Sequence, residues 1–214
     1  MATVIEGVSW ATYESLVNDL KDRPTPRLAY NEGALEIMSP LPAHEERKDL
    51  LVLFIQLVAM ERRIPWKSAG SSTFRQAAQD RGFEPDGCFY IQSISRLPRS
   101  LRRFNAQTLP APDLVIEIDL TNPSLDKLPL YAAFGVGEVW RDDEERVHIL
   151  RRDGEIWSEA DESGVLPGVT GDVLTGFMAR ALEVDSLVWT DEVRAWAHGE
   201  QSGQVGSGHA LSGI

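Results

Sequence analysis

The chain has 214 residues, 43% of them hydrophobic, and a formal net charge of -12. This length and apolar content suffice for one domain with a full hydrophobic core. The negative charge disfavours a nucleic-acid partner without excluding one, because a protein that grips phosphates usually shows a basic face.

The sequence carries no signal for a membrane or for secretion. No run approaches the roughly 18 apolar residues of a membrane span. The first residues, MATVIEGVSW, lack the basic start and apolar middle of a signal peptide. The single cysteine, Cys88, excludes an internal disulfide and agrees with a reducing compartment. We therefore expect a soluble, cytoplasmic protein without a membrane partner.

The first predicted elements are a short helix, a hairpin and a long helix. Apolar residues at helical spacing predict a helix over residues 8–20, with Ser9 as its N-cap. Two short apolar runs in 27–37 flank a turn at residues 31–33 and predict a hairpin. A wide apolar stripe over 43–62 predicts the main core helix, lying across a sheet.

The middle of the chain predicts the core strands and a second helix. The expected strands cover residues 66–75, 84–92 and 111–121, with a polar loop over 76–82. A turn at 122–124, with Asn122 or Ser124 as a cap, leads to a helix over 125–134, which Gly135 ends.

The last third predicts smaller pieces. A fourth strand begins at residues 138–141, and a hairpin over 147–157 turns at Asp153 and Gly154. Two short helical segments, 175–181 and 184–197, follow. Residues 198–214 have almost no core-forming side chains and are expected to be a disordered tail.

This order of elements indicates an α/β fold of the α+β kind. We expect a mixed β-sheet with a helix on each face, preceded by the hairpin and followed by a small C-terminal cap. One domain would cover residues 1–197, with its core at about 29–152.

The geometry of adjacent strands selects among the acidic residues. If 84–92 and 112–121 are antiparallel neighbours, the start of the first strand meets the end of the second. Asp86 then falls beside Glu117 or Asp119. Asp113 is about 13 Å from Glu117 along the strand, too far to share an ion.

Such a pair of carboxylates suits a metal site. Together with Lys127, which can reach back over the end of the strand, Asp86 and Glu117 can hold Mg²⁺ and activate a water for attack on a phosphodiester. The lysine could orient or deprotonate that water, or stabilise charge on the phosphate.

Two runs of the chain, PDGCFYI and PDLVIEIDLTNPSLDKLPLYAAFGVGEVWR, carry a family resemblance. With GALEIMSPLPAHE before them, they resemble the Uma-type family of bacterial predicted restriction endonucleases, which is assigned to the PD-(D/E)XK nuclease superfamily. The likeness extends from about residue 29 to about residue 152. It implies a restriction-endonuclease-like core and a nuclease that uses Mg²⁺ or Mn²⁺.

The resemblance also implies roles for single residues. Asp86 and Glu117 would be the metal ligands and Lys127 the catalytic lysine. The chain departs from the superfamily pattern, because Asp119 and not lysine stands two residues beyond Glu117. The lysine would then have moved onto the helix, with Tyr131 four residues further on.

Other candidates have structural explanations beside the functional ones. His44 and Glu46, in the PAHEE run, are second-tier site residues or simply the polar first turn of a helix. The residues most suited to contact a phosphate backbone lie in one loop that can equally be a solvated surface: Arg96, Arg99, Arg102 and Arg103.

The sequence therefore leaves two hypotheses for the function. The first is a Mg²⁺-dependent endonuclease or related phosphodiesterase acting on nucleic acid. The second is a catalytically silent nuclease-fold module that acts by binding a partner protein or by dimerising, which the missing E-x-K lysine and the acidic charge favour. A homodimer is compatible with either function, since nuclease folds that cut both strands often dimerise, but the sequence does not give the oligomeric state.

Overall fold

The structure is a computed structural model that describes residues 2–21, 23, 25–98, 110–120 and 125–205, the last six of these by their backbone alone. The helices in these ranges are α1 (Trp10–Leu20), α2 (Pro42–Glu61), α3 (Leu128–Phe134), α4 (Gly171–Arg180) and α5 (Ser186–Val205). None of them combines the length and apolar character that crossing a membrane requires.

The described strands form two sheets. In spatial order, the first, called the N-terminal sheet, contains β1 (Ala2–Ile5), β3 (Ala34–Met38), β2 (Arg27–Asn31), β6 (Arg81–Phe83) and β5 (Phe74–Gln76). The second, called the central sheet, contains β11 (Ile156–Glu159), β10 (Val147–Asp153), β9 (Glu138–Asp142), β8 (Leu114–Ile118), β7 (Gly87–Tyr90) and β4 (Lys67–Ser68).

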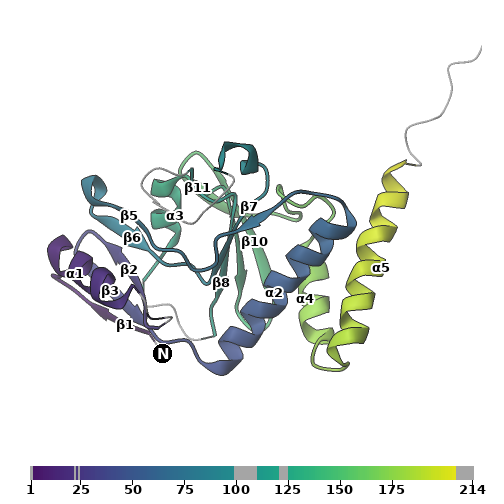
Figure 1. The fold of residues 1–214 in the computed structure, drawn as a ribbon, viewed down its shortest axis with the longest axis horizontal. Coiled ribbons are helices and arrows are strands. Elements are labelled where there is room, and N and C mark those ends of the chain that lie inside the picture. Colours follow the sequence, from purple (N-terminus) through teal and green to yellow (C-terminus); the bar gives the residue numbers. More distant parts are fainter. Residues whose placement is uncertain (1, 22, 24, 99–109, 121–124, 206–214) are drawn as a thin grey trace, which may run out of the picture.

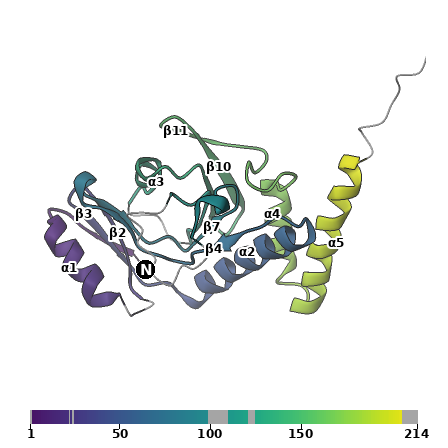
Figure 2. The same cartoon turned by 45° about the horizontal axis from the view of Figure 1, so that its top comes forward.

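Figures 1 and 2 show these elements as successive layers. Helix α1 covers the outer side of the N-terminal sheet, where Tyr13 packs on Tyr30. Helices α2, α4 and α5 cover one face of the central sheet. Helix α3 and the N-terminal sheet lie on its other face, where Phe83 contacts Tyr131 of α3. The alternation of side chains along β8 sends Ile116 to the α2 side and Val115 to the α3 side.

Strand β8 has different neighbours on its two edges. It pairs antiparallel with β7, with Gly87 opposite Ile116, and parallel with β9, with Glu117 opposite Arg141. Continuing the antiparallel register by one residue places Asp86 opposite Glu117. The strand pairing expected from the sequence is therefore confirmed, and the central sheet is mixed.

A buried ion pair fixes helix α2 on the central sheet. The Arg47 guanidinium donates from Nε and Nη2 to the two carboxylate oxygens of Asp142 in β9, at 2.7 and 2.6 Å. Asp142 is fully buried. Because Arg47 lies one turn after His44, this bidentate contact also fixes the start of α2 relative to β8 and β9.

The α+β fold class, the hairpin of β2 and β3, and the helix on each face of the central sheet are confirmed. Other expectations differ. Residues 66–75 do not form one strand, because the chain turns at Gly70 (φ +58°) and sends β4 and β5 to different sheets. The expected loop over 76–82 contains most of β6.

The chain ends also differ from expectation. Strand β1 was not predicted, and α5 continues to Val205, past residue 198, where the sequence indicated a tail.

Helix α3 begins at Leu128, three residues later than expected. The capping residues proposed for it, Asn122 and Ser124, lie outside the described residues.

The contact between α1 and β6 requires a glycine. A Cβ added to Gly82 would overlap the buried phenol of Tyr13. We expect Gly82→Ala to lower the free energy of unfolding by about 1–3 kcal/mol in urea titrations, since rigid neighbours must move. Gly176→Ala is the control, because Gly176 is exposed within α4 and has open space around its Cα. It should raise stability by about 0.5–1 kcal/mol. Equal effects of the two variants would contradict this account.

Candidate active site

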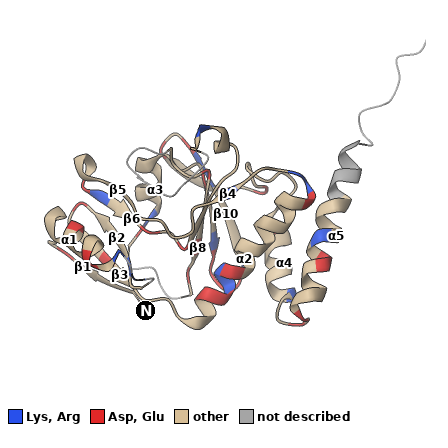
Figure 3. Ribbon diagram, in the orientation of Figure 1, with Lys and Arg blue, Asp and Glu red and all other residues tan. Residues whose placement is uncertain are grey.

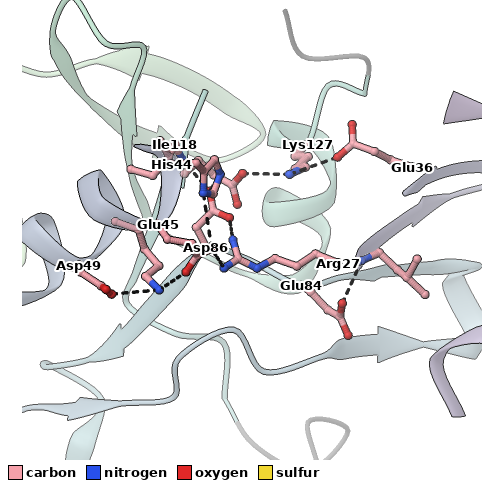
Figure 4. A network of polar contacts seen from close by, with 12 residues as sticks. Arg27, Glu36, His44, Glu45, Asp49, Glu84, Asp86, Ile118 and Lys127 are labelled. Atoms are coloured by element: carbon pink, nitrogen blue, oxygen red, sulfur yellow. Dashed lines mark hydrogen bonds and ion pairs between the residues drawn. The ribbon is translucent and has the colours of Figure 1, made fainter. Parts of the chain in front are cut away.

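A cleft of about 400 Å³ opens where the N-terminal sheet meets the end of β8. Its polar floor includes Glu117 from β8, Lys127 and Tyr131 from α3, Glu36 from β3 and His44 from α2. These four elements, far apart in the sequence, therefore contribute to one cavity. Figure 4 shows the polar network along this floor.

Asp86 lies at the back of this network. Its side chain is only 1% exposed. Oδ2 accepts a hydrogen bond of 2.8 Å from the backbone N–H of Ile118, which holds the carboxylate next to Glu117. Oδ1 accepts from the Arg27 guanidinium, which comes from β2 of the other sheet. A carboxylate this deeply buried requires such a cation, because its desolvation is costly.

Arg27 and His44 complete the surroundings of Asp86. Arg27 also donates to Glu45 at 2.6 Å. His44 Nε2 lies 3.1 Å from Oδ2 of Asp86, but neither buried ring nitrogen makes a well-aligned hydrogen bond with a described residue. Burial, and then the positive charge of Arg27, lowers the pKa of His44. The imidazole is therefore neutral near pH 7, with a lone pair available.

Glu117 is held by two side chains of α3. Its Oε2 accepts from Lys127 Nζ at 3.0 Å and its Oε1 accepts from the Tyr131 hydroxyl. Lys127 is the N-cap residue of α3 and its carbonyl accepts from the N–H of Tyr131. A spacing of four residues puts both side chains on the same side of the helix. Tyr131, expected to be a core residue, is therefore also a partner of the central carboxylate.

Lys127 lies between two carboxylates. Its Nζ is 3.0 Å from Glu117 and 3.3 Å from Glu36. Burial lowers the pKa of Lys127, but the negative charges of Glu117 and Glu36 outweigh that effect, and the resulting pKa lies above its usual value. Lys127 is therefore an ammonium ion at neutral pH in this arrangement.

The structure brings four of the residues singled out in the sequence into one network: Asp86, Glu117, Lys127 and His44. It does not bring in Glu46, which is exposed on α2, and the neighbouring Glu45 makes the contact with Arg27 instead. The helical periodicity explains this, because successive side chains point about 100° apart.

The arginine loop does not adjoin the cleft in the described ranges. Arg96 is exposed beyond the end of β7, at the opposite end of that strand from Asp86, beside a groove that Arg151 and Arg152 also line. Arg99, Arg102 and Arg103 lie outside the described residues.

Asp113, set aside on distance, has a structural role at that same end of the central sheet. Its Oδ2 accepts from the N–H groups of Ile91 and Ser93, at 2.7 and 2.9 Å, and from the Ser93 hydroxyl. These contacts fix the chain where it leaves β7.

Two residues of the network, Glu36 and Arg27, were not singled out in the sequence. Glu36 is a buried acid among the apolar residues of β3, the same signal that singled out Glu117 in β8. Arg27 stands just after the Pro24 and Pro26 pair and gives no local signal. Its role follows only from the packing of the N-terminal sheet against β7.

The described side chains offer two carboxylates in this network but no complete set of metal ligands. No group of three His, Cys, Asp or Glu side chains within the described ranges is arranged to hold a metal. Mg²⁺, however, is commonly bound by one or two carboxylates together with waters and substrate phosphates. Asp86 and Glu117 supply such carboxylates, and the unpartnered nitrogens of His44 lie beside them.

Comparison with known proteins gives the family of this chain. The family model described as "Uma2: Putative restriction endonuclease" matches residues 10–178. The chain belongs to this family. No curated protein matches. A solved structure described as a putative nuclease belonging to DUF820 from Anabaena variabilis matches with a TM-score of 0.53 at 23% identity. The match covers 80% of this chain and 99% of that one, which shows that the Uma2 chain shares the fold of that protein.

The pairing of Arg27 with Asp86 is expected to dominate the stability of the site. Arg27→Met leaves a buried carboxylate without its cation, so the free energy of unfolding at neutral pH should fall by about 3–5 kcal/mol. Urea titration measures this loss. Asp86→Asn in the same chain should recover part of it, and Arg151→Met, at an exposed arginine, serves as the control. Equal stability of the Arg27 and Arg151 variants would show that the ion pair contributes nothing.

Proposed function

We propose that this Uma2 chain is a metal-dependent nuclease that hydrolyses phosphodiester bonds of nucleic acid in the cleft at the end of β8. The observation that carries the proposal is the convergence of its two strand acids and its lysine. Lys127 Nζ lies 3.0 Å from Glu117, and Asp86 is hydrogen-bonded to the residue after Glu117. Membership of a family described as restriction endonucleases supports the same reaction class.

Asp86 and Glu117 would hold Mg²⁺ or Mn²⁺, with His44 as a further donor beside them. When bound, such an ion lowers the pKa of a coordinated water and neutralises charge on the phosphate. The protein's contribution is to fix the two carboxylates before substrate arrives. The Ile118 N–H does this for Asp86, and the Tyr131 hydroxyl does it for Glu117.

Lys127 would act as a fixed cation. Held as an ammonium by Glu117 and Glu36, it can donate hydrogen bonds to a phosphate oxygen on which negative charge develops, or orient the attacking water. A charged lysine cannot take the proton of that water. Glu36 would be a positioning residue, because it contacts the lysine ammonium and acts through it.

A catalytically silent module is the second candidate, and one observation favours it. Arg27 already supplies a positive charge to Asp86, the place where a metal ion would otherwise do so. With Asp86 paired to Arg27 and Glu117 paired to Lys127, both negative charges are balanced without a metal. Such a protein would act by binding a partner or by forming a homodimer.

Substitution of the site residues separates the two candidates. Asp86→Asn and Glu117→Gln should abolish both Mn²⁺ binding, measured by calorimetry, and metal-dependent cleavage of nucleic acid. Lys127→Met should leave metal binding intact and lower the cleavage rate by about 10²–10³-fold, since one group that stabilises charge is lost.

The control is Glu14→Gln, at an exposed acid on α1 that lies outside the cleft. Unchanged metal binding and cleavage in the Asp86 and Glu117 variants would refute the assigned ligands. A wild-type chain that cleaves neither DNA nor RNA with Mg²⁺ or Mn²⁺, but self-associates in sedimentation experiments, would establish the silent module instead.

A further inference from the structure

Arg141 is a cationic side chain in the cleft that the network does not use. It lies on β9 directly opposite Glu117 in the parallel register, so the two side chains share one face of the sheet, and both line the cleft. Lys127, which lines the same cleft, is engaged in ion pairs with Glu117 and Glu36. Arg141 makes no ion pair with any described residue. Asp119 lines the same cleft. Burial raises the pKa of Asp119 and the positive charge of Arg141 opposes that effect, although the two side chains form no ion pair.

A guanidinium in this position suits a phosphate. Arginine presents several N–H donors in a planar fork that matches phosphate oxygens, and a partly enclosed site strengthens that contact. The residue is only partly exposed, so part of its hydration is already lost in the free protein. A phosphate bound there would lie next to Glu117 along the strand pairing, beside the proposed reaction centre.

The walls of the cleft are largely apolar, unlike the walls of a groove that binds only a phosphate backbone. The apolar side chains that line it include Met38, Leu41, Leu120, Leu125 and Leu128. Leu41, at the N-cap of α2, is 52% exposed. An exposed leucine at the rim of a polar site suits contact with an apolar part of a ligand, such as the face of a base.

These apolar walls suit an unpaired strand better than a duplex. In a duplex the base faces are stacked on one another and cannot contact a protein wall, whereas an unpaired strand exposes them. The cleft volume of about 400 Å³ also suits a ligand the size of one nucleotide. The net charge of the chain also favours an unpaired strand over a long duplex. Figure 3 shows basic segments interspersed with acidic ones, and a net charge of -12 opposes a long polyanion more than a short contact.

We propose that the cleft takes an unpaired nucleotide strand, with a phosphate on Arg141 and the adjoining base or sugar against the apolar wall that includes Leu41. This inference rests on the proposed function and specifies its substrate class. It distinguishes residues that bind the strand from residues that carry the reaction, because Arg141 and Leu41 contact substrate parts away from the bond that breaks.

The test is the affinity of the full chain for a fluorescein-labelled single-stranded oligonucleotide and for the matching blunt duplex. Fluorescence anisotropy with Ca²⁺ present reports binding, and a gel verifies that the oligonucleotide stays intact. We expect the single strand to bind more tightly. Arg141→Gln should weaken that binding by about tenfold and reduce the salt dependence by about one phosphate contact. Arg141→Lys should restore the salt dependence.

Matched controls separate these effects from general charge and hydrophobicity. Leu41→Ser should weaken single-strand binding by about fivefold, since an apolar contact is lost. Leu182→Ser, at a residue that is 74% exposed beyond α4, should leave affinity unchanged. Arg151→Gln, on β10 and outside the cleft, should do the same. Thermal unfolding of each variant confirms that the chain is folded.

Tighter binding of the duplex, or equal affinity of wild type and Arg141→Gln for the single strand, overturns the inference. If cleavage then still depends on Asp86 while Arg141→Gln keeps the wild-type KM, the proposed function stands and only the substrate class is wrong. A wild-type chain that neither binds nor cleaves either form overturns both.

Discussion

Two carboxylates buried where the two sheets meet constrain the rest of this structure. Glu117 lies in β8 of the central sheet and Asp86 directly precedes β7, and burying a carboxylate this deeply is costly without a positive partner. The partner of Asp86 comes from β2 of the other sheet. The partner of Glu117, Lys127, comes from α3 and contacts Glu36 of the other sheet as well. Polar contacts at the cleft therefore join layers that elsewhere are held by aromatic packing.

This arrangement explains why a lysine stands directly before the helix between β8 and β9. The parallel pairing of β8 and β9 requires a crossover, and α3 provides it on the face to which Glu117 points. Lys127 and Tyr131, one turn apart, then meet the two oxygens of the same carboxylate. A lysine two residues after the acid on the strand itself would approach from a different direction. The position of Lys127 directly before α3 brings Glu36 of the N-terminal sheet into its surroundings.

The parts of the site that the sequence predicted are those governed by local periodicity and by one strand pairing. Alternation within 111–121 and the antiparallel arrangement of β7 with β8 were enough to bring Asp86 next to Glu117. The place of Lys127 near the start of the following helix also predicted that it could reach back over the end of the strand. The position of the N-terminal sheet could not be predicted in the same way. A strand as short as β6 carries little pattern of its own, and its place depends on pairing with β2, far away in the sequence. Arg27 and Glu36 were missed because the N-terminal sheet sets their place.

The hairpin of β2 and β3 has a consequence for how this family can vary in length. It carries Arg27 on one strand and Glu36 on the other, and its register pairs Ala29 with Glu36 across a tight turn at Glu32 and Gly33. A shift of one residue in that register would turn either side chain to the opposite face of its sheet. Insertions at this turn are therefore costly to the chemistry as well as to the fold, although the turn itself lies on the surface, where loops usually tolerate added residues.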